Sequence, residues 1–293
     1  MIVVVTLARE LISHLLIAAM LIEMLIVARR GVKYRDHFVR QLTTEPGRRA
    51  RVYRFLIVRS WIWAAVVALV ALLSPGLSTV DLGWAWPGGD GIDYLLTGWL
   101  LVMMSVGALR IRGRMRRGHV IPGRAGTAPL VPRTAYERRL AAGVALSVGI
   151  SEEVVYRGLL IGVGTQLYGL PPAAAVFASL ALFVVAHTYQ GRRGMVGIAV
   201  LGGMFTFVYL ISGSLLLAIV LHVFQDLLAL LLIPAYPTAR QVSDDTATVP
   251  ATETAGHARP AASTPALSQS SAMAAQIRPP YPGEGSVLRS TGG

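Results

Sequence analysis

Residues 214–234 read SLLLAIVLHVFQDLLALLLIP, an apolar run that holds His222 and Asp226 in its middle. A helix needs about 20 predominantly apolar residues to cross the hydrocarbon core of a bilayer. The run is long enough, so it predicts a membrane-spanning helix. Ionisable side chains are costly at such a depth, and where they occur they indicate a functional site.

The rest of the chain has the same apolar character. Of its 293 residues, 54% are hydrophobic and only 14% are charged, whereas about a quarter of the residues in a soluble domain are charged. The apolar residues gather into seven segments, at residues 8–28, 55–74, 92–110, 140–168, 172–190, 194–212 and 214–234. We therefore expect an all-α fold, a polytopic membrane helix bundle of about seven spans.

The basic residues predict the orientation of these spans. The net charge is +12, and the polar loops at 29–54 and 110–139 each hold nine Lys or Arg residues, whereas the loop at 75–91 has none. Loops rich in Lys and Arg stay in the cytoplasm. This places the protein in the cell inner (plasma) membrane with a cytoplasmic C-terminus. Because topology explains the charge, we expect no nucleic-acid partner.

The chain divides into three parts. Residues 1–139 hold spans one to three with their basic cytoplasmic loops, and residues 140–234 hold the last four spans. Residues 235–293 are rich in Ala, Pro, Ser, Thr and Gly, and they contain neither Phe nor Trp. Such a segment cannot bury enough apolar area to offset its ordering entropy. We therefore expect a disordered cytoplasmic tail there.

The segment at 140–168 carries three charged residues, Glu152, Glu153 and Arg157. Each charge at the centre of a membrane helix costs about 2.5–3.5 kcal/mol on insertion scales. Glu153 and Arg157 are four residues apart and face each other on a helix, so they can neutralise one another. Glu152 points about 100° away and lacks that partner. It is either a carboxyl that inserts protonated beside a structural ion pair or a proton-transfer group.

Two histidines on later spans extend this pattern. His187 lies near the end of the apolar segment at 172–190. His222 shares a helix face with Asp226. A lone membrane histidine is more often a packing residue than a ligand. Together with Glu152, however, the two imidazoles suit either of two devices. One is a zinc site with Glu152, His187 and His222 as ligands and an open position for water.

The other device is a metal-free site in which a Glu and a His hold and deprotonate water. Asp226 would then orient His222 or a substrate carbonyl. The chain has no cysteine, which excludes disulfides, thiol nucleophiles and thiolate metal sites.

Three short motifs carry a resemblance to a known family: Glu152-Glu153-x-x-x-Arg157-Gly158, Phe183-x-x-x-His187 and His222-x-x-x-Asp226. In this order and on separate apolar segments, they resemble the motifs of the CPBP family. These are the CAAX-processing and bacteriocin-processing intramembrane proteases, also called the Abi family. The resemblance covers residues 140–234, which would form the intramembrane catalytic core. It implies an all-helical core with an active site in a cavity reached from the cytoplasm and the bilayer.

The resemblance also implies roles for the motif residues. Glu152 and His187 would activate the attacking water, and His222 and Asp226 would stabilise the oxyanion or complete a metal site. The ion pair of the first motif would hold its helix in place. The family leaves the need for zinc open, so the resemblance implies either a metalloprotease or a metal-independent enzyme.

The expected function is therefore an intramembrane endopeptidase that hydrolyses peptide bonds in membrane-associated protein or peptide substrates. The chain reads as bacterial, where prenylated Cys-a-a-X proteins are not expected as substrates. Two alternatives stay open. One is a non-catalytic bacteriocin-immunity or envelope partner protein, and the other is a transporter with a Glu and His proton relay.

Overall fold

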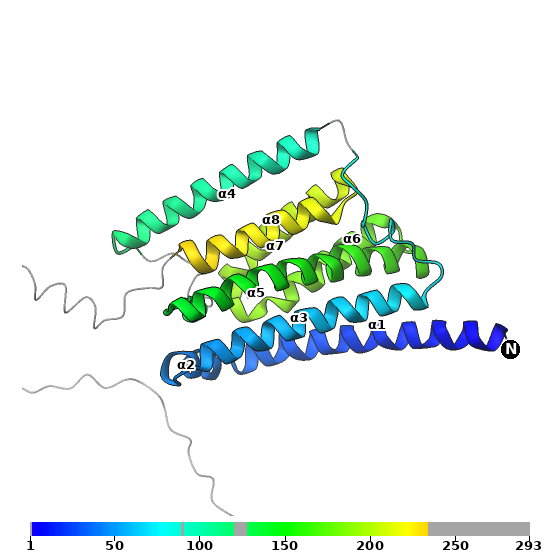
Figure 1. Cartoon of the computed structure of the whole chain (residues 1–293), viewed down its shortest axis with the longest axis horizontal. Coiled ribbons are helices and arrows are strands. Elements are labelled where there is room, and N and C mark those ends of the chain that lie inside the picture. Colours follow the sequence, from blue (N-terminus) through cyan, green and yellow to red (C-terminus); the bar gives the residue numbers. More distant parts are fainter. Residues whose placement is uncertain (1, 89–90, 120–127, 234–293) are drawn as a thin grey trace, which may run out of the picture. The chain divides into compact units, whose positions relative to one another are not determined.

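A computed structural model of the whole chain describes residues 2–88, 91–119 and 128–233. These residues form helices, turns and connections without any strand, which confirms the predicted all-α class. They lie within the unit Met1–Val242 (Figure 1). The disordered tail predicted at 235–293 lies outside the described residues. The division of the remaining chain at residue 139 stays a prediction.

Each of the seven apolar segments coincides with one helix or with a short series of consecutive helices. The first three are α1 (Ile2–Lys33), α3 (Arg48–Leu73) and α4 (Ile92–Arg116). The fourth is α5 (Ala135–Glu153), which continues into two π-helical stretches, η3 (Val154–Leu160) and η4 (Val163–Leu167). The last three are α6 (Pro172–Ala186), α7 (Gly191–Ser212) and α8 (Leu215–Leu227), which continues into the π-helical η6 (Leu228–Leu232).

Five of these helices are long and apolar enough to cross a membrane by length and composition: Val4–Lys33, Arg48–Leu73, Ile92–Arg116, Thr188–Ser212 and Leu215–Leu232. The helix through residues 140–168 is not among them, and α6 is shorter than the others, with 15 residues. The protein is thus a multi-pass membrane protein, whereas the count of about seven spans stays a prediction.

Short helices occupy parts of the connections that the polar composition predicts to be loops. The first is α2 (Arg35–Thr44), which follows α1 directly. The second is the 3₁₀ turn η2 (Ala128–Leu130). A further 3₁₀ turn, η5 (Thr188–Gln190), forms the end of the apolar segment at 172–190 and begins immediately after His187.

The helix formed by α5 and η3 is the central element of the described structure. It packs against α3, α6 and α8, and in Figure 1 it lies between α3 and α8. Its side chains are among the most buried in the protein, with Ala145, Val155 and Leu159 all at 0% exposure. The charged residues of the first motif are therefore carried by the best-packed helix.

Two glycines allow this helix to approach its neighbours closely. A Cβ atom on Gly149 would lie 2.6 Å from Val223 Cγ2 and 2.9 Å from the Val223 nitrogen on α8. A Cβ atom on Gly158 would lie 2.9 Å from the carbonyl oxygen of Leu82. Small residues allow such contacts between membrane helices. The contact at Gly149 brings the motif carboxylates on α5 within reach of the histidine on α8.

Candidate active site

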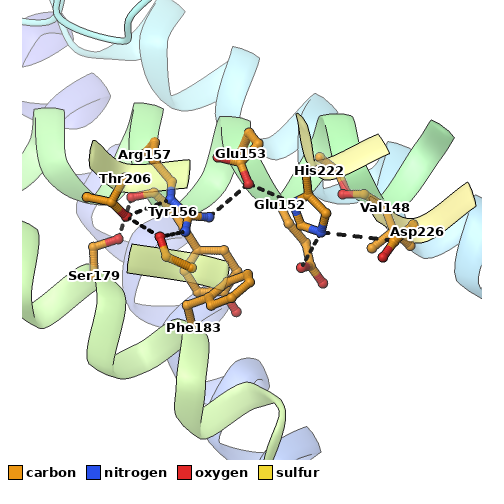
Figure 2. A network of polar contacts seen from close by, with 12 residues as sticks. Val148, Glu152, Glu153, Tyr156, Arg157, Ser179, Phe183, Thr206, His222 and Asp226 are labelled. Atoms are coloured by element: carbon orange, nitrogen blue, oxygen red, sulfur yellow. Dashed lines mark hydrogen bonds and ion pairs between the residues drawn. The ribbon is translucent and has the colours of Figure 1, made fainter. Parts of the chain in front are cut away.

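A buried cluster of charges links α5, η3, α7 and α8. Glu153 Oε1 accepts from Arg157 Nη1 at 2.9 Å and from His222 Nδ1 at 2.6 Å. These three residues are 0%, 1% and 5% exposed. Arg157 also donates to the Gly202 carbonyl at 2.8 Å and to the Thr206 hydroxyl at 3.2 Å. Figure 2 shows Glu153 between Arg157 and His222, so the pair expected from spacing also includes a histidine.

Glu152 points away from that pair and toward the two motif histidines. Its Oε2 atom lies 3.8 Å from His187 Nε2 and 3.8 Å from His222 Nε2. Asp226 Oδ2 lies 4.0 Å from His222 Nε2 (Figure 2). The structure thus brings together side chains from the ends or interiors of α5, α6 and α8, as the three motifs suggested.

Hydrogen bonds at the Nδ1 atoms orient both imidazole rings. His187 Nδ1 lies 2.7 Å from the Phe183 carbonyl oxygen, which can only accept, so Nδ1 carries the proton there. In the neutral ring, His187 Nε2 is then an acceptor that faces Glu152 Oε2. That carboxylate oxygen is buried and has no hydrogen-bond partner among the residues that the structure describes. Two acceptors facing each other across 3.8 Å suit a water molecule that donates to both.

The carboxylate of Glu153 gives His222 a different character. A carboxylate at Nδ1 stabilises a positive charge on the ring, in which both nitrogens are donors. His222 Nε2 can then donate to a negative oxygen that develops near Glu152. The two histidines therefore suit opposite tasks, because His187 has a neutral carbonyl behind it and His222 has a charged carboxylate.

Aromatic rings fix the positions of these side chains. Phe205 stacks on His222 at a centroid distance of 4.9 Å and an interplanar angle of 24°. Phe183 lies 4.6 Å from the His187 ring, and the Arg157 guanidinium lies 4.6 Å from the Phe183 ring on its face. The same phenylalanine therefore contacts both the ion-pair cluster and the catalytic candidates.

The π-helical segment places the arginine. A π-helix makes wider turns than an α-helix and often marks functional sites. η3 begins directly after Glu153 and contains Arg157. The Ser179 hydroxyl on α6 donates to the Tyr156 carbonyl within this segment. Neither the π-helix nor this contact follows from hydrophobic periodicity.

The donor types of Glu152, His187 and His222 suit zinc. However, no group of three or more His, Asp or Glu side chains in the part of the chain that the structure describes has an arrangement that could hold a metal ion. The residues in their described positions therefore do not fit the ion. Zinc stays a prediction, and no chemical step below depends on it.

Several residues on spans one, two and six make contacts that the sequence does not predict. Phe205 and Thr206 contact the site, but they look like ordinary residues of an apolar helix. Glu23 and Arg59 are charged residues within the apolar segments at 8–28 and 55–74, where the sequence alone does not pair them. In the structure, Arg59 Nε lies 3.2 Å from Glu23 Oε1, and the guanidinium lies 4.3 Å from the Trp63 ring centroid.

The first helix also supports the turn that follows His187. The Thr188 hydroxyl donates to the Ala28 carbonyl on α1 at 3.3 Å. A Cβ atom on Gly31 would lie 3.2 Å from the Tyr189 Cβ atom, so α1 packs closely on η5. The N-terminal spans thus take part in holding the position of a catalytic candidate.

A comparison with known families finds a match in the part of the chain that carries this site. Residues 137–228 match the family model described as type II CAAX prenyl endopeptidase Rce1-like. The match confirms the resemblance to the CPBP family for this part of the chain, which holds all three motifs. No curated protein and no solved structure matches the chain significantly. At the level of the family, residues 137–228 are thus similar to an endopeptidase domain.

Proposed function

We propose that this protein hydrolyses peptide bonds in membrane-associated protein or peptide substrates, with Glu152 and His187 activating the attacking water. The observation that carries the proposal is the convergence of Glu152 Oε2 and His187 Nε2, 3.8 Å apart, beside a second histidine. A carboxylate and an imidazole in this arrangement can orient water and accept its proton.

The first chemical step forms a bond between the water oxygen and the scissile carbonyl carbon. The water donates a hydrogen bond to His187 Nε2 with one hydrogen, which stays on the attacking oxygen, and transfers its other proton to the Glu152 carboxylate. The carbonyl oxygen gains the negative charge of the tetrahedral intermediate. Glu152 then gives its proton to the departing amide nitrogen as the C–N bond breaks, which returns the carboxylate to its starting state.

His222 stabilises the negatively charged oxygen of the tetrahedral intermediate. With Glu153 at Nδ1, the ring can donate from Nε2 to the oxyanion, and donors aimed at such an oxygen lower the barrier most in a buried site. Asp226, with its Oδ2 atom 4.0 Å from His222 Nε2, helps to orient this ring or the substrate. Arg157 holds Glu153 in place and does not touch substrate.

In this proposal the protein lies in the inner (plasma) membrane and its C-terminus is cytoplasmic. Support for this orientation comes from the concentration of Lys and Arg in the loops at 29–54 and 110–139. The substrates would reach the site from the membrane, because the helices that carry it have apolar side chains exposed on their outer faces, among them Leu146, Phe177 and Val220. Prenylated proteins are not the substrates that we propose.

The proposal is tested by comparing membrane proteomes of cells with wild-type protein, Glu152→Gln or the control Glu10→Gln, an exposed carboxyl on α1. Loss of a general base lowers hydrolysis by about 10²–10⁴-fold. We expect fragments with wild type and Glu10→Gln that vanish with Glu152→Gln at equal protein levels. Identical fragments in all three samples would support the non-catalytic partner instead. Purified protein assayed with a chelator tests the zinc prediction.

A further inference from the structure

A basic cavity lies away from the candidate active site, where α4 and η6 end. Its volume is about 350 Å³. Its lining combines three arginines with apolar residues: Arg112, Arg116, Arg138, Val131, Pro132 and residues 230–233. We propose that this cavity binds the phosphate headgroup of an anionic phospholipid.

The position of the cavity suits a lipid headgroup. Two candidate membrane spans, Ile92–Arg116 and Leu215–Leu232, both end at its lining residues. The cavity therefore lies where apolar helices give way to polar residues, which is the level at which phospholipid phosphates are found. The last turns of α4 are themselves rich in arginine, and basic segments next to membrane spans attract anionic lipids.

The charges in the cavity require a partner. Three guanidinium groups line it without any Asp or Glu among the lining residues. Arg112 Nη1 donates to the Leu232 carbonyl at 3.3 Å, and Arg138 Nη1 donates to the Leu231 carbonyl at 3.5 Å. Each guanidinium has five N–H donors, so most of the donors stay available. A phosphate group matches several guanidinium groups at once through paired hydrogen bonds.

Capping of the last helix explains only part of this arrangement. Cations near a helix C-terminus interact favourably with its free carbonyl groups, and Arg112 and Arg138 do so here. Arg116 also lines the cavity, but within the described part of the chain no hydrogen bond or ion pair holds its side chain there. A third cation beside two others raises their mutual repulsion, which an anionic ligand would relieve.

The apolar part of the lining favours a phospholipid over a free phosphate ion. Val131 and Ile233 are 7% and 5% exposed, and Leu230, Leu231 and Leu232 are half-buried beside the arginines. An inorganic ion would gain nothing from these leucines. A phospholipid would place its phosphate among the arginines and the start of its acyl chains along the apolar lining residues.

The test uses purified full-length protein in a neutral detergent and measures the thermal unfolding midpoint during titration with phosphatidylglycerol. Phosphatidylcholine and inorganic phosphate are the comparison ligands. The variant R112Q/R116Q removes two cavity charges, and R114Q/R117Q removes two exposed charges from the same segment outside the cavity. We expect phosphatidylglycerol to raise the midpoint in wild type and R114Q/R117Q. For R112Q/R116Q, the phosphatidylglycerol concentration required should rise about fivefold for each arginine removed.

Equal responses of the two double variants to phosphatidylglycerol would overturn the proposal. So would an equal rise of the wild-type midpoint with phosphatidylcholine or with inorganic phosphate alone. If R112Q/R116Q does not fold because Arg112 caps the last helix, the single variants R116Q and R117Q give the same comparison. Their side chains are both exposed and differ in whether they line the cavity.

Discussion

Glu153 contacts two basic side chains at once, Arg157 and His222, and this shared carboxylate is the most informative contact at the scale of single residues. The substitution Glu153→Gln leaves a buried guanidinium without its counter-charge, which costs about 3–5 kcal/mol. We expect a lower thermal unfolding midpoint and lost activity. Both can be measured on the purified protein.

The double variant Glu153→Gln/Arg157→Met separates folding from catalysis. Replacing a buried ion pair by apolar or neutral groups is often tolerated, so we expect the unfolding midpoint to recover. Activity should stay low, because His222 still lacks the carboxylate that supports its charge. Full recovery of activity in this variant would show that Glu153 acts only through Arg157.

The residues of the site differed in how well the sequence could predict them. Ionisable side chains stand out against apolar spans, so helical spacing alone indicated the Glu153–Arg157 pair. Phe205 and Thr206 could not be found in this way, since their roles depend on which face of α7 meets α8. Glu23 and Arg59 were visible as charges, but only packing of α1 on α3 shows that they pair.

At the scale of elements, α5 and α8 approach closely at Gly149. This approach determines whether the carboxylates on α5 meet His222 on α8. The Cβ of Gly149→Ala would lie 2.9 Å from the backbone nitrogen of Val223, which cannot move aside as a flexible side chain can. Overpacking of this kind costs about 1–3 kcal/mol. We expect Gly149→Ala to lower both the unfolding midpoint and activity.

Gly203→Ala is the matched control, because nothing lies within 4 Å of a Cβ atom built there. Alanine is the better helix former by about 1 kcal/mol, so this variant should be as stable as wild type or more stable. An equal loss in the two variants would contradict the importance of the contact between α5 and α8.

The helices themselves were largely predictable, since each long apolar segment forms one. The π-helical stretches were not, because they preserve the apolar composition and change only the turn. The positions of α2 and η2 also required the structure. Polar composition indicates a connection, but it does not distinguish a loop from a short helix that packs on a neighbour.

At the scale of the whole described molecule, an ion pair joins the start of α3 to the start of α5. Arg49 Nη1 lies 3.1 Å from both carboxylate oxygens of Glu137, and Arg49 also donates to the carbonyls of Leu42 and Pro129. The nearby Tyr53 hydroxyl donates to the Leu130 carbonyl. These contacts tie the N-terminal spans to the helix that carries the candidate site.

This ion pair predicts a pH dependence of stability. Burial raises the pKa of Glu137, but the Arg133 N–H and the Arg49 guanidinium outweigh it, so this pKa lies below its ordinary value. The folded state therefore binds its proton more weakly than the unfolded state. The stabilisation is present above the ordinary pKa and is lost as the pH falls through the lowered one. We expect the unfolding midpoint of wild type to fall in acid more than that of Glu137→Gln.

Glu45→Gln is the control for this measurement. Glu45 pairs with Arg51 at 3.5 Å in an exposed position, where an ion pair contributes little. Its acid response should match that of wild type. If Glu137→Gln loses stability in acid as steeply as wild type does, the ion pair is not the source of the pH dependence.

The central claim is that Glu152 and His187 act on the same water molecule. The most direct test measures kcat for purified Glu152→Gln, His187→Gln and the double variant on one cleaved substrate. Residues that act as a unit show strongly non-additive effects, so we predict that the double variant is about as slow as the slower single variant. A kcat lowered by the product of the two single effects would contradict a shared water.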